Sequence, residues 1–397
     1  MKKILIILLL SFFLFTGCSS PESAGPLAQE VEAPPVPEPE PLPGEIQVQE
    51  PKESPKLAIW LAKKDEVIES QKPYSLIMSA WFEPQEADQM RAQNPDMLLL
   101  AGLTTNWIYD HEGWKEFLLT VASHNQDTTY KLTDQMYLKN SSGEKCAFGW
   151  ESDEWNHDEI YSMDPRNPEW KELIVSFYST VLEQPQHDGI IVDMVVEEQY
   201  WCPGSISREE WISATKQIME EIQEKNTQSK LVIFNAGLQY EDLDEFKEDM
   251  DGYVLENFLV ECGASYEQGL AAAETPYIVV YAVDTDDSGL KDLNRMRLGL
   301  TLSLLNDNTY FAYDFGPRDH GQAWWFPEYD VDLGEPLGVY YEKDGAYWRE
   351  FENGVVVSSP NKEAAVEFET EYIDATTGIS SKTFVVEAGD GRIYLEE

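Results

Sequence analysis

Basic residues are scarce in this chain of 397 residues. Only 28 lysines and arginines stand against 74 aspartates and glutamates, which gives a formal net charge of −46. A polyanionic nucleic acid would be repelled by such a chain, and no cluster of basic residues offsets that repulsion. The composition therefore excludes a nucleic acid as partner. It also disfavours a strongly anionic polysaccharide as substrate unless a local basic site exists.

Motifs that bind metals or nucleotides are missing as well. The four cysteines include no CxxC pair and the five histidines are scattered, so we expect no structural zinc site. The chain has neither a glycine-rich phosphate loop nor a Gly-x-Ser-x-Gly motif, and NTPase and α/β-hydrolase chemistry therefore have no support. The sequence implies no metal and no cofactor.

Long apolar runs are absent after the first fifteen residues. Lys2 and Lys3 precede an apolar run at 4–15, which is shorter than the roughly 20 residues of a membrane span. Thr16-Gly17-Cys18 follows and resembles the cleavage site of a bacterial lipoprotein, although Phe15 stands where Leu is commonest. We interpret 1–18 as a lipoprotein signal peptide with Cys18 lipidated; the alternatives are an ordinary signal peptide or an uncleaved anchor. The predicted location is extracellular, lipid-anchored to the cell membrane.

The next segment, 19–56, is rich in Pro, Glu, Ala and Ser. Proline removes backbone donors and the like charges repel, so this segment is predicted to be a disordered linker. The rest of the chain is long enough for one large domain, which we assign to 57–337, and a small one at 338–397.

Short apolar runs alternate with amphipathic stretches from position 74 onward. The expected strands are 75–81, 97–103, a weak one at 135–138, 189–195, 231–235, 252–258, 277–283 and 309–315. The expected helices are 85–93, 112–123, 168–182, 208–225, 243–250, 266–273 and 289–305. Mostly continuous apolar strands are typical of parallel strands buried on both faces. About eight such units predict a (β/α)8 TIM barrel. An open doubly wound sheet would usually carry a glycine-rich loop after its first strand, and this chain has WFEP there.

The pattern changes after about residue 337. Asn353-Gly354, between runs at 347–351 and 355–358, predicts a hairpin with a type I′ turn. Further alternating runs follow at 365–369, 383–387 and 392–395. They predict a small antiparallel β-domain, which serves either as a structural cap or as a carbohydrate contact.

Two of the expected barrel strands end on a carboxylate after the same pattern, DGIIVD at 188–193 and DGYVLE at 251–256. Active sites of TIM barrels lie at the C-terminal ends of the strands, and strands four and six are alternate strands whose inward side chains share a level. Facing carboxyls raise at least one pKa, which separates the acid from the nucleophile or base that glycoside hydrolysis needs. We predict Asp193 and Glu256 as the catalytic pair. If the register of the strand at 189–195 differs from the one assumed, Glu197 or Glu198 takes the catalytic role assigned to Asp193.

Other strand ends carry polar or aromatic side chains that suit a sugar, because flat rings match the apolar faces of pyranoses. We predict that substrate contacts come from Trp81, Trp107, Asn235, Asp284, Asp314, Trp324 and Trp325. Trp201 occupies a similar position. A disulfide between Cys202 and Cys262 is conceivable and would brace the loops after strands four and six.

These motifs resemble those of the hypothetical glycosyl hydrolase families of TIM-barrel type, which are akin to α-1,4-polygalactosaminidase and, more distantly, to α-galactosidases. Further matches are DPRNPEW at 164–170, WWFPEY at 324–329, DLGEPLG at 332–338 and REFENG at 349–354. The resemblance spans about 73–359. It implies Asp193 as nucleophile, Glu256 as acid/base and retention of configuration, and it does not fix the sugar.

The leading hypothesis is thus a retaining glycoside hydrolase acting on an extracellular oligo- or polysaccharide. A non-catalytic carbohydrate-binding lipoprotein on the same scaffold is the alternative from another class, and a salt bridge from Arg or Lys to either acid, or a blocked pocket, would favour it. An inverting hydrolase with the same residues would hold its carboxyls about 6.5–9.5 Å apart, against about 5 Å for retention. The oligomeric state is not indicated.

Overall fold

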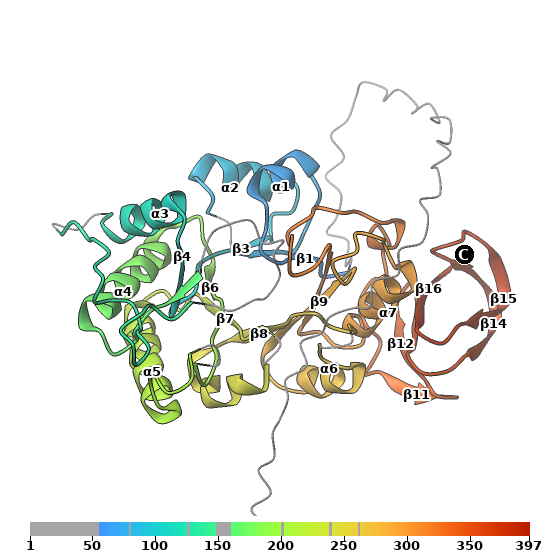
Figure 1. The fold of residues 1–397 in the computed structure, drawn as a ribbon. Coiled ribbons are helices and arrows are strands. Elements are labelled where there is room, and N and C mark those ends of the chain that lie inside the picture. Colours follow the sequence, from blue (N-terminus) through green and yellow to red (C-terminus); the bar gives the residue numbers. More distant parts are fainter. Residues whose placement is uncertain are drawn as a thin grey trace, which may run out of the picture. The chain divides into compact units, whose positions relative to one another are not determined.

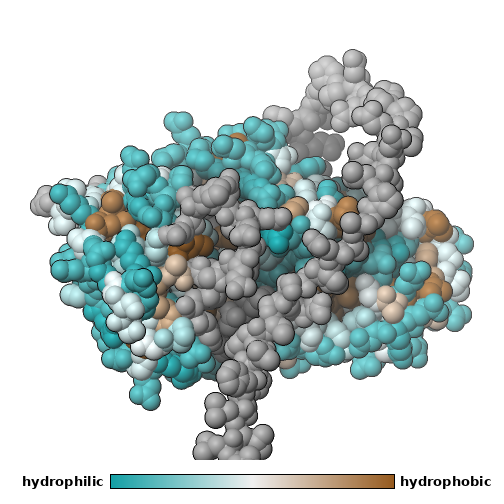
Figure 2. Space-filling view, in the orientation of Figure 1, coloured by the Kyte–Doolittle hydropathy of each residue, from teal (hydrophilic) through white to brown (hydrophobic). Residues whose placement is uncertain are grey.

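The computed structural model describes residues 55–397 except 79–80, 125–127, 148–159, 200–201, 238–239 and 261–262. The expected signal peptide, Cys18, almost all of the linker, Trp201 and Cys262 lie outside the described residues. Residues 51–397 form one compact unit. Hydrophilic side chains cover most of the visible face of the described residues (Figure 2), in keeping with the strongly acidic composition. None of the helices in the described part is long and apolar enough to span a membrane.

Eight parallel strands form the central sheet (Figure 1), each paired with the next in a single order. They are β1 (Ala58–Ile59), β2 (Leu76–Met78), β3 (Leu98–Ala101), β6 (Gly189–Val192), β7 (Leu231–Asn235), β8 (Gly252–Leu255), β9 (Ile278–Asp284) and β10 (Thr309–Asp314). A parallel bridge between Leu57 and Phe311 joins the first strand to the last. The Phe311 N–H donates to the carbonyl of Lys56 at 2.9 Å across this seam. The predicted TIM barrel is confirmed.

One strand prediction is wrong and one strand was not predicted, and the two errors offset each other. The run at 135–138 is not a barrel strand, because Tyr137 only bridges Met163 in antiparallel fashion beside the small sheet of β4 (Trp107–Tyr109) and β5 (Ile160–Ser162). The true first strand, β1, was missed because only two residues of it pair regularly. The strand that begins at Gly189 therefore remains the fourth, and the one at Gly252 the sixth.

Helices follow the barrel strands along the chain (Figure 1). They are α1 (Lys64–Ser70), α2 (Pro84–Arg91), α3 (Glu112–Ala122), α4 (Pro168–Glu183), α5 (Arg208–Lys225), α6 (Tyr266–Ala273) and α7 (Leu293–Ser303). The expected bounds of α5 and α6 match the structure, and side-chain caps explain why: Ser207 Oγ accepts from the Glu210 N–H. The helix expected at 243–250 is wrong. Two 3-10 helices, η1 (Tyr240–Glu245) and η2 (Lys247–Asp249), occupy that position.

Alternating side chains on each strand decide which residues reach the barrel mouth. The barrel interior is packed with inward residues that include Leu100, Ile191, Ile233, Val254, Val280, Ala282 and Ala312. Successive side chains of a strand point to opposite faces, so a residue two positions further on also points inward. That parity directs Asp193, Asn235, Glu256, Asp284 and Asp314 into the C-terminal end of the barrel.

The repeated Asp-Gly at the start of β6 and β8 has a structural explanation. Asp188 and Asp251 each accept a backbone N–H from the preceding strand of the sheet at 2.8 Å. A Cβ on Gly189 or Gly252 would lie 2.2 or 2.4 Å from the carbonyl oxygen of the next strand, so only glycine fits this close approach. The likeness of the two segments thus reflects a shared strand start as well as a shared strand end.

The C-terminal sheet has six antiparallel strands in the order β11-β12-β13-β16-β14-β15. They are β11 (Tyr341–Lys343), β12 (Ala346–Phe351), β13 (Gly354–Ser359), β14 (Ala364–Asp374), β15 (Ser380–Val386) and β16 (Asp390–Glu396). The hairpin near residue 353 exists, but its type I′ assignment is wrong, because its two turn residues lack positive φ. The type I′ signature occurs one hairpin earlier, where Asp344 and Gly345 have φ of 53° and 79°.

The C-terminal sheet packs directly on α7. Arg297 of α7 donates from Nε and Nη2 to the two carboxylate oxygens of Asp390 at 2.8 and 3.0 Å. A Cβ on Gly391 would meet Thr301 Oγ1 at 1.9 Å, so β16 and α7 are in van der Waals contact. Arg349 of β12 also donates to the Leu304 carbonyl just after α7, at 3.0 Å.

The disulfide differs from the pair that the sequence made conceivable. Cys202 is bonded to Cys146, not to Cys262. Cys146 lies beside β5, where its carbonyl accepts the Ser162 N–H at 2.8 Å, and the bond joins this region to the loop after β6. The sequence concealed this pairing because Cys146 lies in an irregular segment whose path has no periodic signal.

Candidate active site

Asp193 and Glu256 meet at the barrel mouth through a shared partner. Asn235 Nδ2 donates to Asp193 Oδ1 and to Glu256 Oε2, each at 2.8 Å. Twice this distance, 5.6 Å, is the greatest separation that the two acceptor oxygens can have. The predicted acids therefore lie together, and Asn235, predicted as a sugar contact, bridges them.

The backbone turns sharply after each of the two acids. Met194 and Asn257 follow them directly and have φ of 57° and 55°, in the left-handed region. Asparagine tolerates this region, whereas a methionine there is strained at a cost of about 1–2 kcal/mol. The Met194 N–H donates to Asp193 Oδ1 at 2.8 Å. Such strain is common at functional sites, where it holds a side chain in a required direction.

His320 completes the cluster and was not predicted. Its Nε2 lies 3.0 Å from Glu256 Oε1, and its Nδ1 lies 3.0 Å from Asp314 Oδ2. The imidazole is 6% exposed, and the ring of Trp60 packs edge-on against it. Both ring nitrogens face carboxylates, so the protonated form, which donates from both, fits the geometry.

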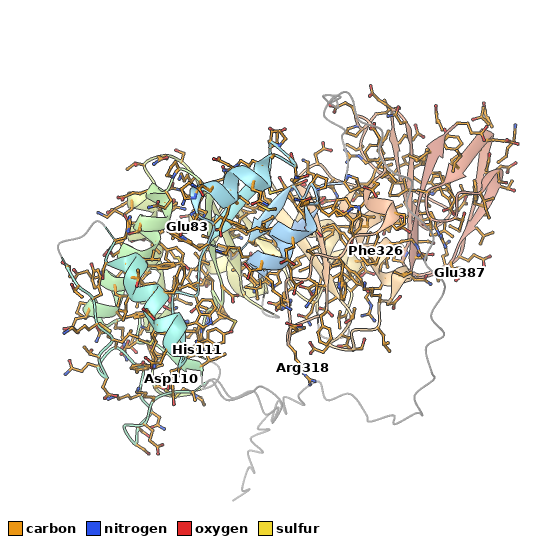
Figure 3. The ribbon with its side chains drawn as sticks, turned by 90° about the horizontal axis from the view of Figure 1, so that it is seen from above. Glu83, Asp110, His111, Arg318, Phe326 and Glu387 are labelled. Carbon is orange, nitrogen blue, oxygen red and sulfur yellow. A yellow bond between two sulfur atoms is a disulfide. The ribbon has the colours of Figure 1, made fainter. Side chains whose placement is uncertain are left out.

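The loop that carries His320 is fixed to its neighbours. The Arg318 N–H (labelled in Figure 3) donates to Asp287 Oδ1 at 2.8 Å, in the loop after β9. The Gly321 N–H donates to Asp314 Oδ2 at 3.1 Å. The imidazole therefore approaches Glu256 from a held backbone.

Burial and charge give the two acids opposite pKa shifts. Burial raises the pKa of Asp193 to about 6, and the charge of Glu256 adds to the rise. Burial would raise the pKa of Glu256 too, but the hydrogen bond and charge of His320, together with Asn235, hold it below the ordinary value. Burial disfavours the charge on His320, yet Asp314 and Glu256 raise its pKa well above the ordinary value. The free site therefore holds an imidazolium, an ionised Glu256 and an Asp193 that takes up a proton near pH 6.

Two further acids predicted as sugar contacts are buried in the same region. The Asp314 carboxylate is already bonded to His320 and Gly321. Asp284 is 1% exposed; its Oδ1 accepts the Asp286 N–H at 2.6 Å and its Oδ2 has no partner. Burial raises the pKa of Asp284 to about 7, with the charge of Asp314 contributing. These acids shape the charge of the site from below its surface.

A pocket of about 230 Å³ opens beside Asp193 on the other side of the mouth. Trp107 lines it, as predicted for a substrate contact, and so do Tyr109 and Trp114, which were not predicted. Burial raises the pKa of Tyr109 to about 12, and the charges of Asp193 and Glu256 contribute, so its hydroxyl stays protonated beside the pair.

The other predicted tryptophans lie apart from this cluster. Trp81 bonds to Glu83 through its indole N–H at 3.1 Å, while Trp324 packs against the outward-facing Tyr313, next to Phe326 (labelled in Figure 3). Trp325 packs against Tyr74, which precedes β2. Trp324 and Trp325 were predicted as contacts because they follow a strand, but the chain after β10 turns away from the barrel mouth before it reaches them.

Glu197 and Glu198 were the alternatives to Asp193 in case of a register error. Glu197 forms an ion pair with Arg208, the first residue of α5. Asp193 is the residue that follows β6 directly and contacts Asn235. The register in which Asp193 ends the strand therefore holds.

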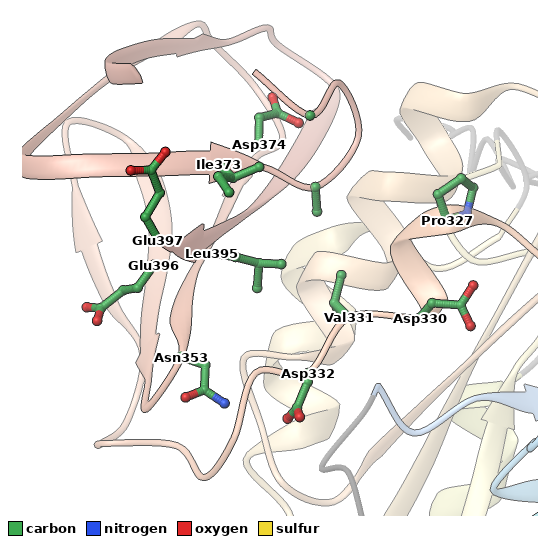
Figure 4. Close-up of a pocket in the computed structure, with 12 residues that line it drawn as sticks. Pro327, Asp330, Val331, Asp332, Asn353, Ile373, Asp374, Leu395, Glu396 and Glu397 are labelled. Atoms are coloured by element: carbon green, nitrogen blue, oxygen red, sulfur yellow. The ribbon is translucent and has the colours of Figure 1, made fainter. Parts of the chain in front are cut away.

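A second pocket, of about 620 Å³, lies between 327–332 and the C-terminal sheet (Figure 4). Several carboxylates line it, and two of them already have hydrogen-bond partners. Asp374 accepts the N–H groups of Thr376 and Thr377, and Asp330 accepts the Trp325 indole N–H. No barrel strand end reaches it. Among the described residues, no group of three or more His, Cys, Asp or Glu side chains is arranged to hold a metal.

The sequence of residues 91–355, more than half of the chain, matches the hypothetical glycosyl hydrolase family 15. The chain belongs to this family. Asp193, Asn235, Glu256, Asp314 and His320 all fall within the matched residues. Membership makes the protein a glycoside hydrolase by class and confirms the resemblance seen in the sequence.

Solved structures of similar fold are distant. An α-amylase from Geobacillus thermoleovorans in complex with acarbose is 13% identical, with 84% of this chain and 91% of that chain covered and a TM-score of 0.44. An α-amylase from Malbranchea cinnamomea is 10% identical, with 84% and 88% covered and a TM-score of 0.47. The glycoside hydrolase domain of PelA from Pseudomonas aeruginosa is 13% identical, with 68% and 96% covered and a TM-score of 0.42. No curated protein matches the chain in sequence. At this distance no substrate or residue role transfers.

Proposed function

We propose that the protein hydrolyses a glycosidic bond of an extracellular saccharide with retention of configuration, using Asp193 and Glu256. The observation that carries this proposal is the shared donor: Asn235 limits the nearest oxygens of the two acids to 5.6 Å or less. Retaining enzymes hold their carboxyls about 5–5.5 Å apart, whereas inverting enzymes need about 6.5–9.5 Å for a water between them.

The charges around the pair support a division of roles that is the reverse of the one implied by the family resemblance. Glu256 is kept ionised by His320, which suits a nucleophile, and Asp193 has the raised pKa of a general acid. In the first step Glu256 attacks the anomeric carbon while Asp193 gives its proton to the departing glycosidic oxygen. In the second step Asp193 takes a proton from water, and the water oxygen displaces Glu256 from the sugar.

Asp314 and His320 act as positioning residues in this scheme. The imidazolium donates to Glu256 and fixes which of its oxygens faces the substrate, while Asp314 holds the other ring nitrogen. The negative charge of Asp314, whose Oδ2 lies 3.0 Å from Nδ1, keeps the imidazole protonated although it is buried. Asn235 has a comparable role, since its one amide nitrogen sets the spacing of the pair.

The binding-protein alternative has less support. It would be favoured by an Arg or Lys bonded to either acid, and the cation beside Glu256 is instead a histidine. It would also be favoured by a blocked mouth, whereas Asp193 borders an open pocket.

The deciding experiment measures hydrolysis of a panel of aryl α- and β-glycosides and polysaccharides by the purified full chain, beside Asp193→Ala and Glu256→Ala. We expect both variants to lose activity while their circular dichroism is unchanged. Proton NMR of the first-formed sugar should show the anomeric configuration of the substrate. Activity that survives both substitutions, or inversion at the anomeric carbon, would contradict the proposal.

Covalent trapping separates the two role assignments. A 2-deoxy-2-fluoro glycosyl fluoride of the hydrolysed sugar should leave a glycosyl ester on the nucleophile, which peptide mass spectrometry locates. We expect the label on Glu256. A label on Asp193 would restore the roles implied by the resemblance and leave the pair and the retention intact.

We also propose that Cys18 carries a lipid that anchors the protein outside the cell membrane, as the lipoprotein-like Thr16-Gly17-Cys18 suggests. Labelled palmitate should be incorporated by the full chain in a bacterial host and not by Cys18→Ala. Equal labelling of both would refute the anchor.

A further inference from the structure

The barrel mouth has two halves of different chemistry, and Asp193 lies at their boundary. One half, over β7 to β10, presents Asn235, Glu256 and His320 with the buried acids behind them. The other half is the pocket of about 230 Å³, formed by the segments after β1 and β3 and by α3 and α4. The lining residues on which the argument depends are Ala62, Thr104, Trp107, Tyr109, Trp114 and Asp193.

Among the residues that the structure describes, the pocket has few side chains that can form hydrogen bonds. Of its lining side chains, Thr104, Tyr109 and Asp193 carry oxygen, and Thr104 Oγ1 is already used, donating to the Trp107 carbonyl at 2.7 Å and accepting the Trp107 N–H at 3.0 Å. Burying a hydroxyl without a hydrogen-bond partner is unfavourable, because the hydroxyl loses its bonds to water. A pyranose, with hydroxyls around its ring, would leave several of them unsatisfied in this pocket.

The aromatic side chains give the pocket a flat wall that reaches the surface. Tyr109 and Trp114 stack with ring centroids 5.6 Å apart and an interplanar angle of 22°. Trp114 is 41% exposed, a large apolar surface in contact with solvent at the rim of the pocket. An apolar cavity of about 150 Å³ is already large enough to take up benzene. A pocket of about 230 Å³ thus accommodates an aromatic ring or a short alkyl chain.

We propose that this pocket binds the aglycone, and that the extracellular saccharide is joined at the hydrolysed bond to an apolar aryl or alkyl group, which is the leaving group. The inference rests on the proposed function, because the acid/base gives its proton to the leaving oxygen and the aglycone therefore lies on the side of Asp193. The sugar occupies the polar half of the mouth, where Glu256 attacks, and the leaving group occupies the apolar half.

The test measures by fluorine NMR how 4-fluorophenol, a molecule of the size of an aryl aglycone, binds to the full chain. We expect saturable binding to the wild type, and at least tenfold weaker binding to Ala62→Phe, which fills the pocket. The matched control is Ala92→Phe, the same change at an exposed position after α2, which should bind like the wild type. Trp114→Ala, at the partly exposed rim of the pocket, should weaken binding about threefold to tenfold.

Three outcomes overturn the proposal: no saturable binding by the wild type, equal binding by Ala62→Phe and Ala92→Phe, or displacement of the probe by free glucose, galactose or N-acetylglucosamine. The last would make the pocket a sugar subsite. Glu256→Gln separates this inference from the proposed function, because it should bind the probe like the wild type while hydrolysis is lost. Hydrolysis with no probe binding would reject the aglycone pocket and leave the proposed function standing.

Discussion

Two buried polar clusters in this protein differ in how their charges balance. At the junction of α7 with the C-terminal sheet, Arg297 and Arg392 both bind Asp390, and Arg392 also pairs with Asp374, so two cations face two acids. The side chains of Arg297 and Asp390 are 7% and 1% exposed. At the barrel mouth, His320 is the cation that contacts both Glu256 and Asp314, and together with Asp193 these acids outnumber it. A balanced buried cluster holds a structure together, whereas an unbalanced one shifts pKa values and serves chemistry.

The comparison also bears on the role of the C-terminal sheet. Its junction residues are paired, buried and close enough to α7 that Gly391 has no room for a side chain. The acids of the nearby pocket are open to solvent or already bonded to backbone groups (Figure 4). The sheet therefore has the features expected of a structural cap, the first of the two roles that the sequence left open.

The largest expected effect breaks the unbalanced cluster at its centre. Asp193→Asn and Glu256→Gln keep the shape of each side chain and remove the ionisable group, so we expect kcat to fall by about 10³-fold or more in each. Asp193→Asn should be as stable as the wild type or more stable, since repulsion between the acids is removed, whereas Glu256→Gln should lower stability because His320 loses a charged partner. Steady-state kinetics and thermal melts check this. A variant that loses activity together with its melting transition would point to a structural role instead.

The balanced cluster should respond in the opposite way. Asp390→Asn leaves buried guanidinium charge without a full partner, so we expect the free energy of unfolding to fall by about 3–5 kcal/mol. Below the unfolding transition, kcat should match the wild type. Urea titration gives the stability, and activity measured in the same samples gives the contrast. A large drop in kcat in folded protein would show that the sheet acts in catalysis.

His320→Gln tests how the unbalanced cluster distributes its charge. Without the imidazolium the pKa of Glu256 should rise, so the ascending limb of the pH–rate profile moves to higher pH and kcat falls about 10²-fold. The descending limb of the wild type should lie near pH 6, because activity requires protonated Asp193. A merely structural role for His320 would lower stability and leave the profile in place.

The pH dependence of stability has a definite sign at Asp193. Its pKa is raised by folding, so its contribution to stability is complete below its unfolded pKa and is lost as the pH rises through about 6. Asp193→Asn should remove this loss. Melting temperatures of wild type and variant between pH 4 and 8 provide the measurement, and parallel curves would contradict the raised pKa.

The smallest effect is expected at the tryptophans that face away from the mouth. Trp324→Phe keeps an aromatic ring against Tyr313, so KM and kcat should stay within about twofold of the wild type. Trp107→Phe, in the pocket, should alter KM for aryl glycosides by more. Equal changes at both positions would mean that the outer tryptophan reaches substrate after all.

What the sequence predicted follows from regular structure. Asp193 and Glu256 could be paired because strands alternate their side chains and barrel strands end at one rim, so position along a strand fixes direction. His320 could not be found this way, since it lies in a loop six residues beyond Asp314 and loops have no period. The nearest signal was its closeness in sequence to an acid that ends a barrel strand.

Other misses have physical causes of their own. The first strand is too short to show a pattern. The run at 135–138 is apolar because it lies beside the small β4–β5 sheet, and it takes no part in the barrel. The partner of Cys202 depends on how an irregular segment crosses the surface, which composition does not encode. Trp324 and Trp325 were likewise predicted at the barrel mouth, but residues 322–326 lead away from it.

The seam that closes the barrel has a mechanical consequence. The carbonyl of Leu57 accepts the N–H groups of Ser75 and Leu76 at 2.8 and 3.1 Å, and Lys56 accepts from Phe311 on the other side. Any tension carried along the chain from its N-terminal end enters the barrel here, at a strand of two regular residues. Parallel neighbours on both sides share that load along the strand axis, so their hydrogen bonds must shear together rather than open one at a time.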